Sequence, residues 1–369
     1  MKVMYICGMY VPSHGGAEIS MYSLLKKLQE NFGWDIIAIT DERYEKTKEL
    51  EEFNKIQLYT TSHDNREKEI KRMVLKFKPD VILTQLMWSN VALKLAKKHS
   101  IPSIMRVCKV PLELDLTKDS KYAPTEIISI SNSVKEYVLK HWNRESNIIK
   151  PLVEIDNYII KKEDFDPSKN NLIFMFNPLQ RKGGLIFKEI AKKLPFEKFG
   201  TVLGWSSLKD NKNSDNFSGE YIKRITESEG STFGGSLPSY VNFDDYENVK
   251  IFPSENDPKV FYEQMKILLI PSQWEEAFGR VAIEAMINGI PVIASNFAGL
   301  KDSVGDGGIL IERDNVKGWV NEILKFNNIG YYKEVSEKAK NWVKKNYSEK
   351  KIIRASVNLI EKAVNQFGK

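Results

Sequence analysis

The chain alternates between short apolar runs and longer amphipathic stretches. In its first half, runs typical of buried strands occur near residues 2–7, 34–39, 56–59, 80–84, 103–107 and 127–131. Stretches with helical spacing lie between them, including 16–30, 66–77, 89–99 and 132–141. This alternation predicts a parallel sheet with helices on both faces.

A second alternating series begins near residue 171. Its strands are expected near 171–176, 200–203, 249–252, 267–270, 291–294 and 309–311, with helices at about 331–345 and 349–366 after the last strand. The segment 161–170 is polar and contains Pro167, as linkers often do. We therefore expect two α/β domains, residues 1–165 and 166–350, and a final helical segment at 351–369.

Residues 206–248 differ from the rest of the second series. They are rich in Ser, Asn, Asp and Gly and poor in aliphatic side chains. The segment is either a polar loop insertion or an element that covers a ligand or binds a second substrate.

Charge and composition exclude several classes of protein. Residues 1–165 contain 26 Lys+Arg and 23 Asp+Glu, and the remainder contains 29 and 26, so each part has a net charge of +3. No basic domain exists, and nucleic acid is not indicated as a partner. There is no signal-peptide pattern and no apolar run long enough to span a membrane. Two cysteines suggest a reduced, cytoplasmic protein without a zinc site.

One basic amphipathic segment, residues 68–78, has two interpretations. It is either a surface helix packed on the sheet, or a contact with an anionic membrane at the inner face.

The stretch from Glu275 to Ser295 carries the clearest candidate chemistry. A buried strand ending at Pro271 leads into a loop with Glu276, then into a helix that begins at Gly279 and carries Glu284 in its second turn. Asn288-Gly289 fits the end of this helix. Helix N-termini at the carboxyl ends of parallel strands favour phosphate, and the carboxylates can accept hydrogen bonds from hydroxyls. The stretch therefore suits a hydroxyl-rich, anionic ligand.

Two other loops have residues suited to phosphate. Gly15-Gly16 lies between the first strand and the first helix, but the loop lacks the dinucleotide fingerprint, which disfavours a nicotinamide enzyme. His14 beside it faces either the site or solvent. Arg181 and Lys182 follow the first strand of the second domain, where cations beside a glycine suit a diphosphate.

The stretch at 275–295 resembles the signature of glycosyltransferase family 4, the retaining nucleotide-sugar enzymes of the GT-B fold. That signature has a glutamate, Phe-Gly, a second glutamate followed by alanine, and Gly-x-Pro-Val. The chain matches it at Glu276, Phe278, Gly279, Glu284, Ala285, Gly289, Pro291 and Val292. The resemblance implies two Rossmann-like parallel-sheet domains facing an interdomain cleft, with the final helix crossing back to the first domain.

The resemblance also implies roles for residues. Glu276 and Lys182 would be catalytic, and Glu284 would hold the ribose of the donor. The backbone amides near Phe278, Gly279 and Arg280 would face the donor sugar and diphosphate. Gly15 and Gly16 resemble the Gly-Gly-Ala-Glu segment of the family, where the glycines face the donor diphosphate.

Two positions depart from the family pattern. Asn177 stands where the family has an arginine, and Arg181 is the candidate to supply the missing charge. Cys108 stands where many members have a histidine near the sugar. Arg106 or Lys109 would then point into the cleft instead, or Cys108 is simply a buried thiol.

Together with the resemblance, these features predict a glycosyltransferase without a cofactor or metal, and the resemblance implies a retaining reaction. It would move a sugar from a nucleotide-diphosphate donor to a hydroxyl acceptor (a glycan, a lipid-linked molecule or a small molecule) in bacterial polysaccharide or glycoconjugate synthesis. Two alternatives stay open. One is an epimerase or phosphorylase on the same architecture, and the other is a non-catalytic nucleotide-sugar-binding protein.

Overall fold

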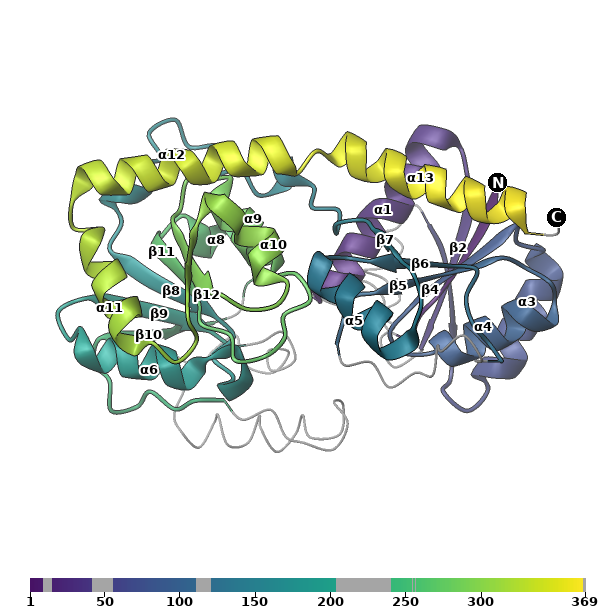
Figure 1. Cartoon of the computed structure of the whole chain (residues 1–369), viewed down its shortest axis with the longest axis horizontal. Coiled ribbons are helices and arrows are strands. Elements are labelled where there is room, and N and C mark those ends of the chain that lie inside the picture. The colour runs from purple at the N-terminus through teal and green to yellow at the C-terminus, as the bar shows by residue number, and fades with distance from the viewer. Residues whose placement is uncertain are drawn as a thin grey trace. The chain divides into compact units, whose positions relative to one another are not determined.

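The chain folds into two compact units. The structure, a computed structural model, describes residues 1–8, 15–41, 56–110, 121–203, 240–253, 255 and 257–367. Unit 1 consists of Met1–Glu154 and Tyr347–Lys369, and unit 2 consists of Ile155–Asn346 (Figure 1). The chain thus leaves unit 1 once and returns to it at its C-terminal end.

Unit 1 is built on a seven-stranded parallel sheet with the strand order β3-β2-β1-β4-β5-β6-β7. The strands are β1 (Lys2–Ile6), β2 (Asp35–Asp41), β3 (Gln57–Thr61), β4 (Val81–Gln85), β5 (Ser103–Val107), β6 (Glu126–Ser129) and β7 (Asn147–Ile148). The helices are α1 (Gly16–Phe32), α3 (Arg66–Phe77), α4 (Ser89–Lys98), α5 (Asn132–Trp142) and α13 (Glu349–Gln366).

The last helix of the chain completes the core of unit 1. Ile353, Val357 and Ile360 recur at helical spacing along α13, so their side chains lie on one face. All three are buried in the cluster that includes Leu25 and Leu28 of α1. Residues at opposite ends of the sequence therefore share one apolar core.

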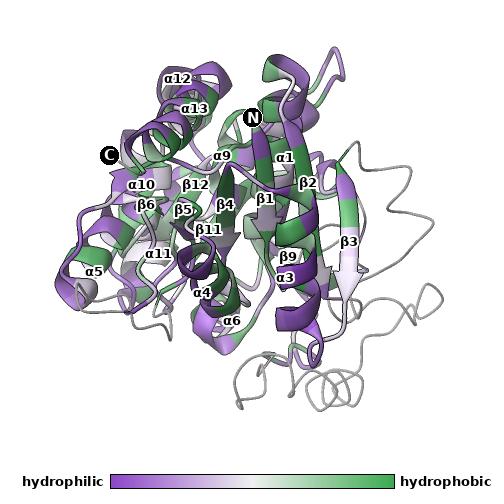
Figure 2. Cartoon of the chain, turned by 90° about the vertical axis from the view of Figure 1, so that its right-hand side faces the viewer, coloured by the Kyte–Doolittle hydropathy of each residue, from purple (hydrophilic) through white to green (hydrophobic). Residues whose placement is uncertain are grey.

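The apolar side of α3 packs inside unit 1. Ile70, Met73 and Val74 are buried together with Ile82 of β4, whereas Leu75 is exposed. In Figure 2 the strands β2 and β4 are largely hydrophobic, while α3 shows polar residues towards the viewer. This packing supports the interpretation of the basic segment as a surface helix on the sheet.

Unit 2 is built on a six-stranded parallel sheet with the strand order β10-β9-β8-β11-β12-β13. The strands are β8 (Leu172–Phe176), β9 (Lys198–Val202), β10 (Val249–Phe252), β11 (Met265–Ile270), β12 (Val292–Ser295) and β13 (Ile309–Ile311). The α-helices are α6 (Gly184–Lys193), α8 (Lys259–Tyr262), α9 (Arg280–Met286), α10 (Leu300–Val304), α11 (Val316–Lys325) and α12 (Ile329–Asn346). The 3₁₀ turns are η2 (Ile155–Asn157), η3 (Pro167–Lys169), η4 (Gln180–Lys182) and η5 (Gly305–Gly307).

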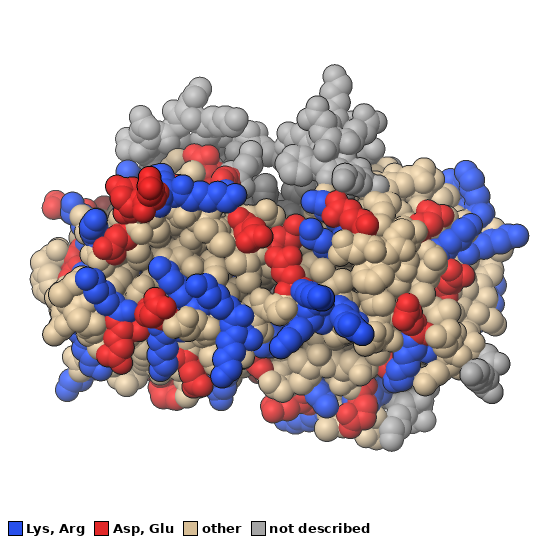
Figure 3. All heavy atoms as spheres, turned by 90° about the horizontal axis from the view of Figure 1, so that it is seen from above, with Lys and Arg blue, Asp and Glu red and all other residues tan. Residues whose placement is uncertain are grey.

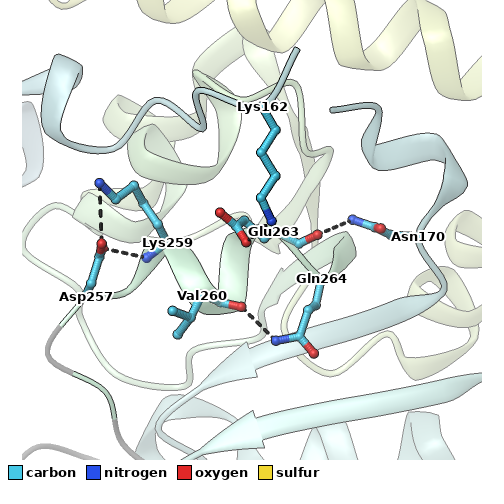
Figure 4. A network of polar contacts seen from close by, with 7 residues as sticks. All are labelled: Lys162, Asn170, Asp257, Lys259, Val260, Glu263 and Gln264. Carbon is cyan, nitrogen blue, oxygen red and sulfur yellow. Dashed lines mark hydrogen bonds and ion pairs between the residues drawn. The ribbon is translucent and has the colours of Figure 1, made fainter. Parts of the chain in front are cut away.

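The polar segment 161–170 is attached to unit 2 along its length. Lys162 forms an ion pair with Glu263, and Asn170 Nδ2 donates to the carbonyl oxygen of Glu263 at 2.9 Å (Figure 4). Asn170 Nδ2 also donates to the carbonyl oxygen of Met265 at 3.0 Å. Pro167 is buried. The division between the units accordingly falls after Glu154 rather than after residue 165. Polar composition suggested a linker, but these side chains hydrogen-bond to the fold.

Most strands lie where the hydrophobic pattern predicts them, with ends differing by one or two residues. The exception is β7, which has only two residues and no apolar run from which to predict it.

Basic and acidic side chains are mixed on the face shown in Figure 3. No described helix is long and apolar enough to cross a bilayer.

Candidate functional site

The candidate site of unit 2 lies at the carboxyl ends of β8 and β11. These strands are neighbours in the sheet, and the chain reverses its direction of travel across the sheet between them, with β9 on one side and β12 on the other. Ligands of open parallel sheets bind at such a switch point. The loop after β8 contains Lys182, and the loop after β11 contains Glu276.

Lys182 and Glu276 are in direct contact. Lys182 Nζ donates to Glu276 Oε1, across 94 residues of sequence, and Ser272 Oγ donates to the same oxygen at 3.1 Å. Both side chains are partly exposed. Glu276 Oε2 accepts no hydrogen bond from any residue that the structure describes. The pair therefore presents one oriented carboxylate oxygen and one cation at the switch point.

Gly183 allows the two loops to approach this closely. It has a φ of +89°, and a Cβ atom there would lie 1.9 Å from the carbonyl oxygen of Pro271. Such a contact is impossible for any residue with a side chain. The glycine after Lys182 thus positions the lysine against the loop that contains Glu276.

The predicted helix after Glu276 is present as α9. Gly279 precedes it with a φ of +90°, and a Cβ atom there would lie 2.6 Å from Leu300 Cδ2. Phe278 is buried. The amide of Gly299 donates to the carbonyl oxygen of Glu276 at 2.8 Å, which fixes the loop from the other side. At the far end, Gly289 has a φ of +72°, a left-handed conformation that fits its predicted place at the end of the helix.

Glu284 has a different environment from Glu276. It is 6% exposed, and its Oε2 accepts a hydrogen bond from Tyr262 Oη at 2.7 Å. Its Oε1 lies 3.4 Å from Arg280 Nη2, which also donates to Tyr158 Oη at 3.1 Å. Burial, and then the Glu284 carboxylate, raise the pKa of Tyr262 well above its usual value. The Arg280 side chain therefore orients Glu284 from within the unit.

Arg181 lies beside Lys182 on η4, with its guanidinium 5.3 Å from the centre of the Trp274 ring. Asn177, at the family's arginine position, has a φ of +57°, and its buried Oδ1 has no hydrogen-bond partner among the described residues. The sequence thus places two cations, Arg181 and Lys182, on one turn after β8. That Arg181 replaces the family's arginine stays a prediction.

In unit 1, Arg106 supports the first turn of α1. It is 5% exposed, and it donates to the carbonyl oxygen of Ala17 at 3.2 Å, to Ser20 Oγ at 2.9 Å and to Gln85 Oε1 at 2.8 Å. Gly15 precedes this helix and Gly16 begins it. Arg106 therefore holds the first turn of α1 in place and so positions the glycines at the start of that helix.

Cys108 follows β5 next to the same network. Its Sγ lies 3.8 Å from Gln85 Oε1, and removal of the thiol from water raises the pKa of Cys108 to about 12. A raised pKa disfavours Cys108 as a base, and its correspondence to the family's histidine stays a prediction. Lys109 is exposed, and His14 lies outside the described residues.

Several residues of these sites were not predicted, and three of them are buried or contact a predicted glutamate. Glu18 is 4% exposed in the first turn of α1, and burial raises its pKa, against smaller opposite effects of a backbone hydrogen bond and of Arg106. Ser272 and Tyr262 contact the two glutamates. Glu18 belongs to the Gly-Gly-Ala-Glu segment and Ser272 directly follows a strand end, so both had a signal in the sequence. Tyr262 had none. Across the described residues, no group of three or more His, Cys, Asp and Glu is placed to hold a metal.

Comparison with known proteins supports a glycosyltransferase. Residues 245–349 match the family model for group 1 glycosyl transferases. An uncharacterized 41.2 kDa protein in the cps region of Klebsiella pneumoniae is 30% identical over 122 residues, 32% of this chain and 31% of that protein. The capsular polysaccharide biosynthesis glycosyltransferase CapM of Staphylococcus aureus is 25% identical over 58% of this chain and 55% of its own length. These matches span about a third to a half of the relatives.

Solved structures show the fold over the whole chain. A glycosyltransferase from Rickettsia africae has a TM-score of 0.76 at 19% identity, covering 99% of both chains. Anabaena Alr3699/HepE in complex with UDP and glucose has a TM-score of 0.74 at 15% identity, covering 98% of this chain and 99% of that one. Two doubly wound parallel sheets of seven and six strands are the GT-B architecture, which confirms the predicted fold class.

Proposed function

We propose that the protein is a retaining glycosyltransferase that uses a nucleotide-diphosphate sugar. The observation that carries the proposal is the Lys182–Glu276 pair at the switch point between β8 and β11. The family-model match over residues 245–349 and the UDP complexes of the Anabaena structures support it.

In this proposal unit 2 binds the donor. Glu276 accepts hydrogen bonds from sugar hydroxyls through Oε2, while Lys182 and Ser272 hold Oε1. Glu284 holds the ribose, with its carboxylate already oriented by Tyr262 and Arg280. Fixed groups of this kind lower the entropic cost of bringing the reacting atoms together.

The reaction exchanges one bond at the anomeric carbon. The bond to the leaving phosphate oxygen breaks and a bond to the acceptor oxygen forms on the same face, while the acceptor proton passes to the departing diphosphate. Lys182, with Arg181 beside it on η4, stabilises the negative charge of the diphosphate. No metal participates, and the acceptor is a hydroxyl of a glycan or glycoconjugate, a class suggested by the capsular relative.

The test is an assay of nucleoside diphosphate release from UDP-, GDP- and ADP-sugars with a panel of hydroxyl acceptors. We expect turnover of at least one donor, undiminished by a chelator. Glu276→Ala should lower kcat/KM at least about 100-fold, the scale seen when one charge-orienting group is lost. Glu275→Ala is the matched control, because Glu275 is the exposed neighbouring carboxylate and should be close to wild type.

Three results would contradict the proposal. Donor binding without turnover would indicate a binding protein. A change of sugar configuration without nucleotide release would indicate an epimerase. Equal losses in Glu275→Ala and Glu276→Ala would remove the assigned role of Glu276.

A further inference from the structure

Arg313 lies where three loops of unit 2 converge. It follows β13, its guanidinium stacks over the Phe297 ring at 3.9 Å, and its Nη1 donates to the carbonyl oxygen of Gln273 at 3.2 Å. Phe297 comes from the loop after β12, and Gln273 from the loop after β11. Since the strands are parallel neighbours, Arg313 lies at the sheet edge that also holds the candidate site.

The charge of Arg313 has no counter-ion in the described part of the chain. No described carboxylate lies within ion-pair distance of it. The neighbouring Glu312 instead accepts a hydrogen bond from Asn296 Nδ2 at 2.8 Å. A guanidinium has five N–H donors, and the contact with Gln273 uses one of them. The ring of Phe297 therefore holds in place a partly buried cation that keeps most of its donors for another partner.

Gln273 links this cation to the Lys182–Glu276 pair. The backbone N–H of Gln273 donates to the carbonyl oxygen of Arg181 at 2.9 Å, and Arg181 lies on the turn that ends in Lys182. The preceding residue, Ser272, bonds to Glu276. Gln273 thus connects Arg313 to the two loops that contain Lys182 and Glu276.

We propose that Arg313 binds an anionic substituent, a carboxylate or a phosphate, of a sugar substrate. The proposal rests on the proposed glycosyltransferase function. A planar guanidinium matches the two oxygens of either anion in a bidentate pair, and the aromatic ring beneath it fixes its plane. The anion has two sources: a uronate on the donor sugar, or a phosphate on the acceptor.

The test is a binding titration of the full-length protein with two pairs of probes, each differing in one anionic group. UDP-glucuronate and UDP-glucose form the donor pair. Both contain the diphosphate, so a difference between their affinities reports on the carboxylate alone. Glucose 6-phosphate and glucose form the acceptor pair, because a phosphate on C6 is not at the donor's leaving-group position. We expect wild type to prefer the anionic member of one pair by about tenfold or more, as one charge-assisted bidentate contact allows. Arg313→Gln should abolish the preference, and Arg313→Lys should keep only part of it.

Lys317→Gln is the control, since it removes the same charge from an exposed site on α11. A preference in the donor pair assigns the anion to the donor, and one in the acceptor pair assigns it to the acceptor. The inference is overturned if wild type has no preference in either pair, or if Arg313→Gln retains it. If no nucleotide sugar binds but Arg313→Gln still loses a preference for glucose 6-phosphate, the proposed function fails while the anion site stands.

Discussion

At the scale of single residues, environment separates side chains of the same type. Glu276 is partly exposed and keeps one oxygen without a partner among the described residues, while Glu284 is buried with both oxygens engaged. In the proposed function, Glu276 would contact the sugar that reacts, and Glu284 would hold the ribose, which does not react. Glu18 is a third case, a carboxyl buried within the first turn of α1.

Glu18 makes a pH-dependent contribution to stability. Because burial raises its folded-state pKa above 4.5, the favourable contribution is complete below pH 4.5 and is lost as the pH rises through the raised value. We therefore expect Glu18→Gln to have a higher Tm than wild type at pH 8 and the same Tm at pH 4. Thermal unfolding across this range measures the difference.

The control for Glu18 is Glu30→Gln, at the exposed end of the same helix, which should show no such trend. A lower Tm of Glu18→Gln at pH 8 would mean that the backbone hydrogen bond of the Glu18 carboxylate and its attraction to Arg106 together outweigh the cost of burial.

At the scale of elements, the site depends on loops whose backbones lie so close to each other that only glycine fits at the points of contact. Gly183 lies against Pro271, and a Cβ atom on Gly299 would lie 2.2 Å from the carbonyl oxygen of Ala277. The end of the polar insertion packs at the same place, since Val241 N donates to the carbonyl oxygen of Pro178 at 3.0 Å. Residues 204–239, on which the predicted covering role depends, lie outside the described residues.

We expect Gly183→Ala to separate the two loops and to lower turnover by at least about tenfold, because misplaced catalytic groups lose rate steeply. Its left-handed φ alone costs about 1–2 kcal/mol for a residue with a side chain. Gly33→Ala is a matched control: Gly33 also has a positive φ, +64°, but nothing lies within 4 Å of the added methyl group. Assays and unfolding curves of both variants separate strain from loop displacement. Equal turnover in the two variants would contradict the role of Gly183.

At the scale of the whole molecule, the two units have separate cores. The C-terminal helix α13 contributes Ile353, Val357 and Ile360 to unit 1, whereas the core around Phe187 and Trp319 belongs to unit 2. The final segment of the chain is therefore part of the fold of the first unit.

Ile360→Ala should destabilise unit 1 by about 2–5 kcal/mol, the cost of truncating a buried aliphatic side chain. Calorimetry should show the transition of unit 1 at a lower temperature and that of unit 2 unchanged. Asn358→Ala, on the exposed side of the same helix, should leave both transitions in place. Equal shifts of both transitions by Ile360→Ala would show that the units unfold as one.

The sequence alone determined the alternation of strands and helices, because burial on a parallel sheet requires apolar runs whose spacing is visible in the chain. It also identified the loops with Lys182, Gly183 and Glu276, since glycines and charged residues at strand ends are local features. It missed β7, which is too short to have a pattern, and it suggested a linker at 161–170, because polar composition does not reveal hydrogen-bond partners.

Tertiary structure decided which of these residues meet. The order of strands in the sheet brings Lys182 to Glu276 across 94 residues and brings Arg313 onto Phe297. It also buries Arg106 under α1, where sequence reasoning allowed it to be open to a substrate. Contacts of this kind depend on which strands are neighbours and on the close approach of backbones. Neither can be predicted from the local order of residues.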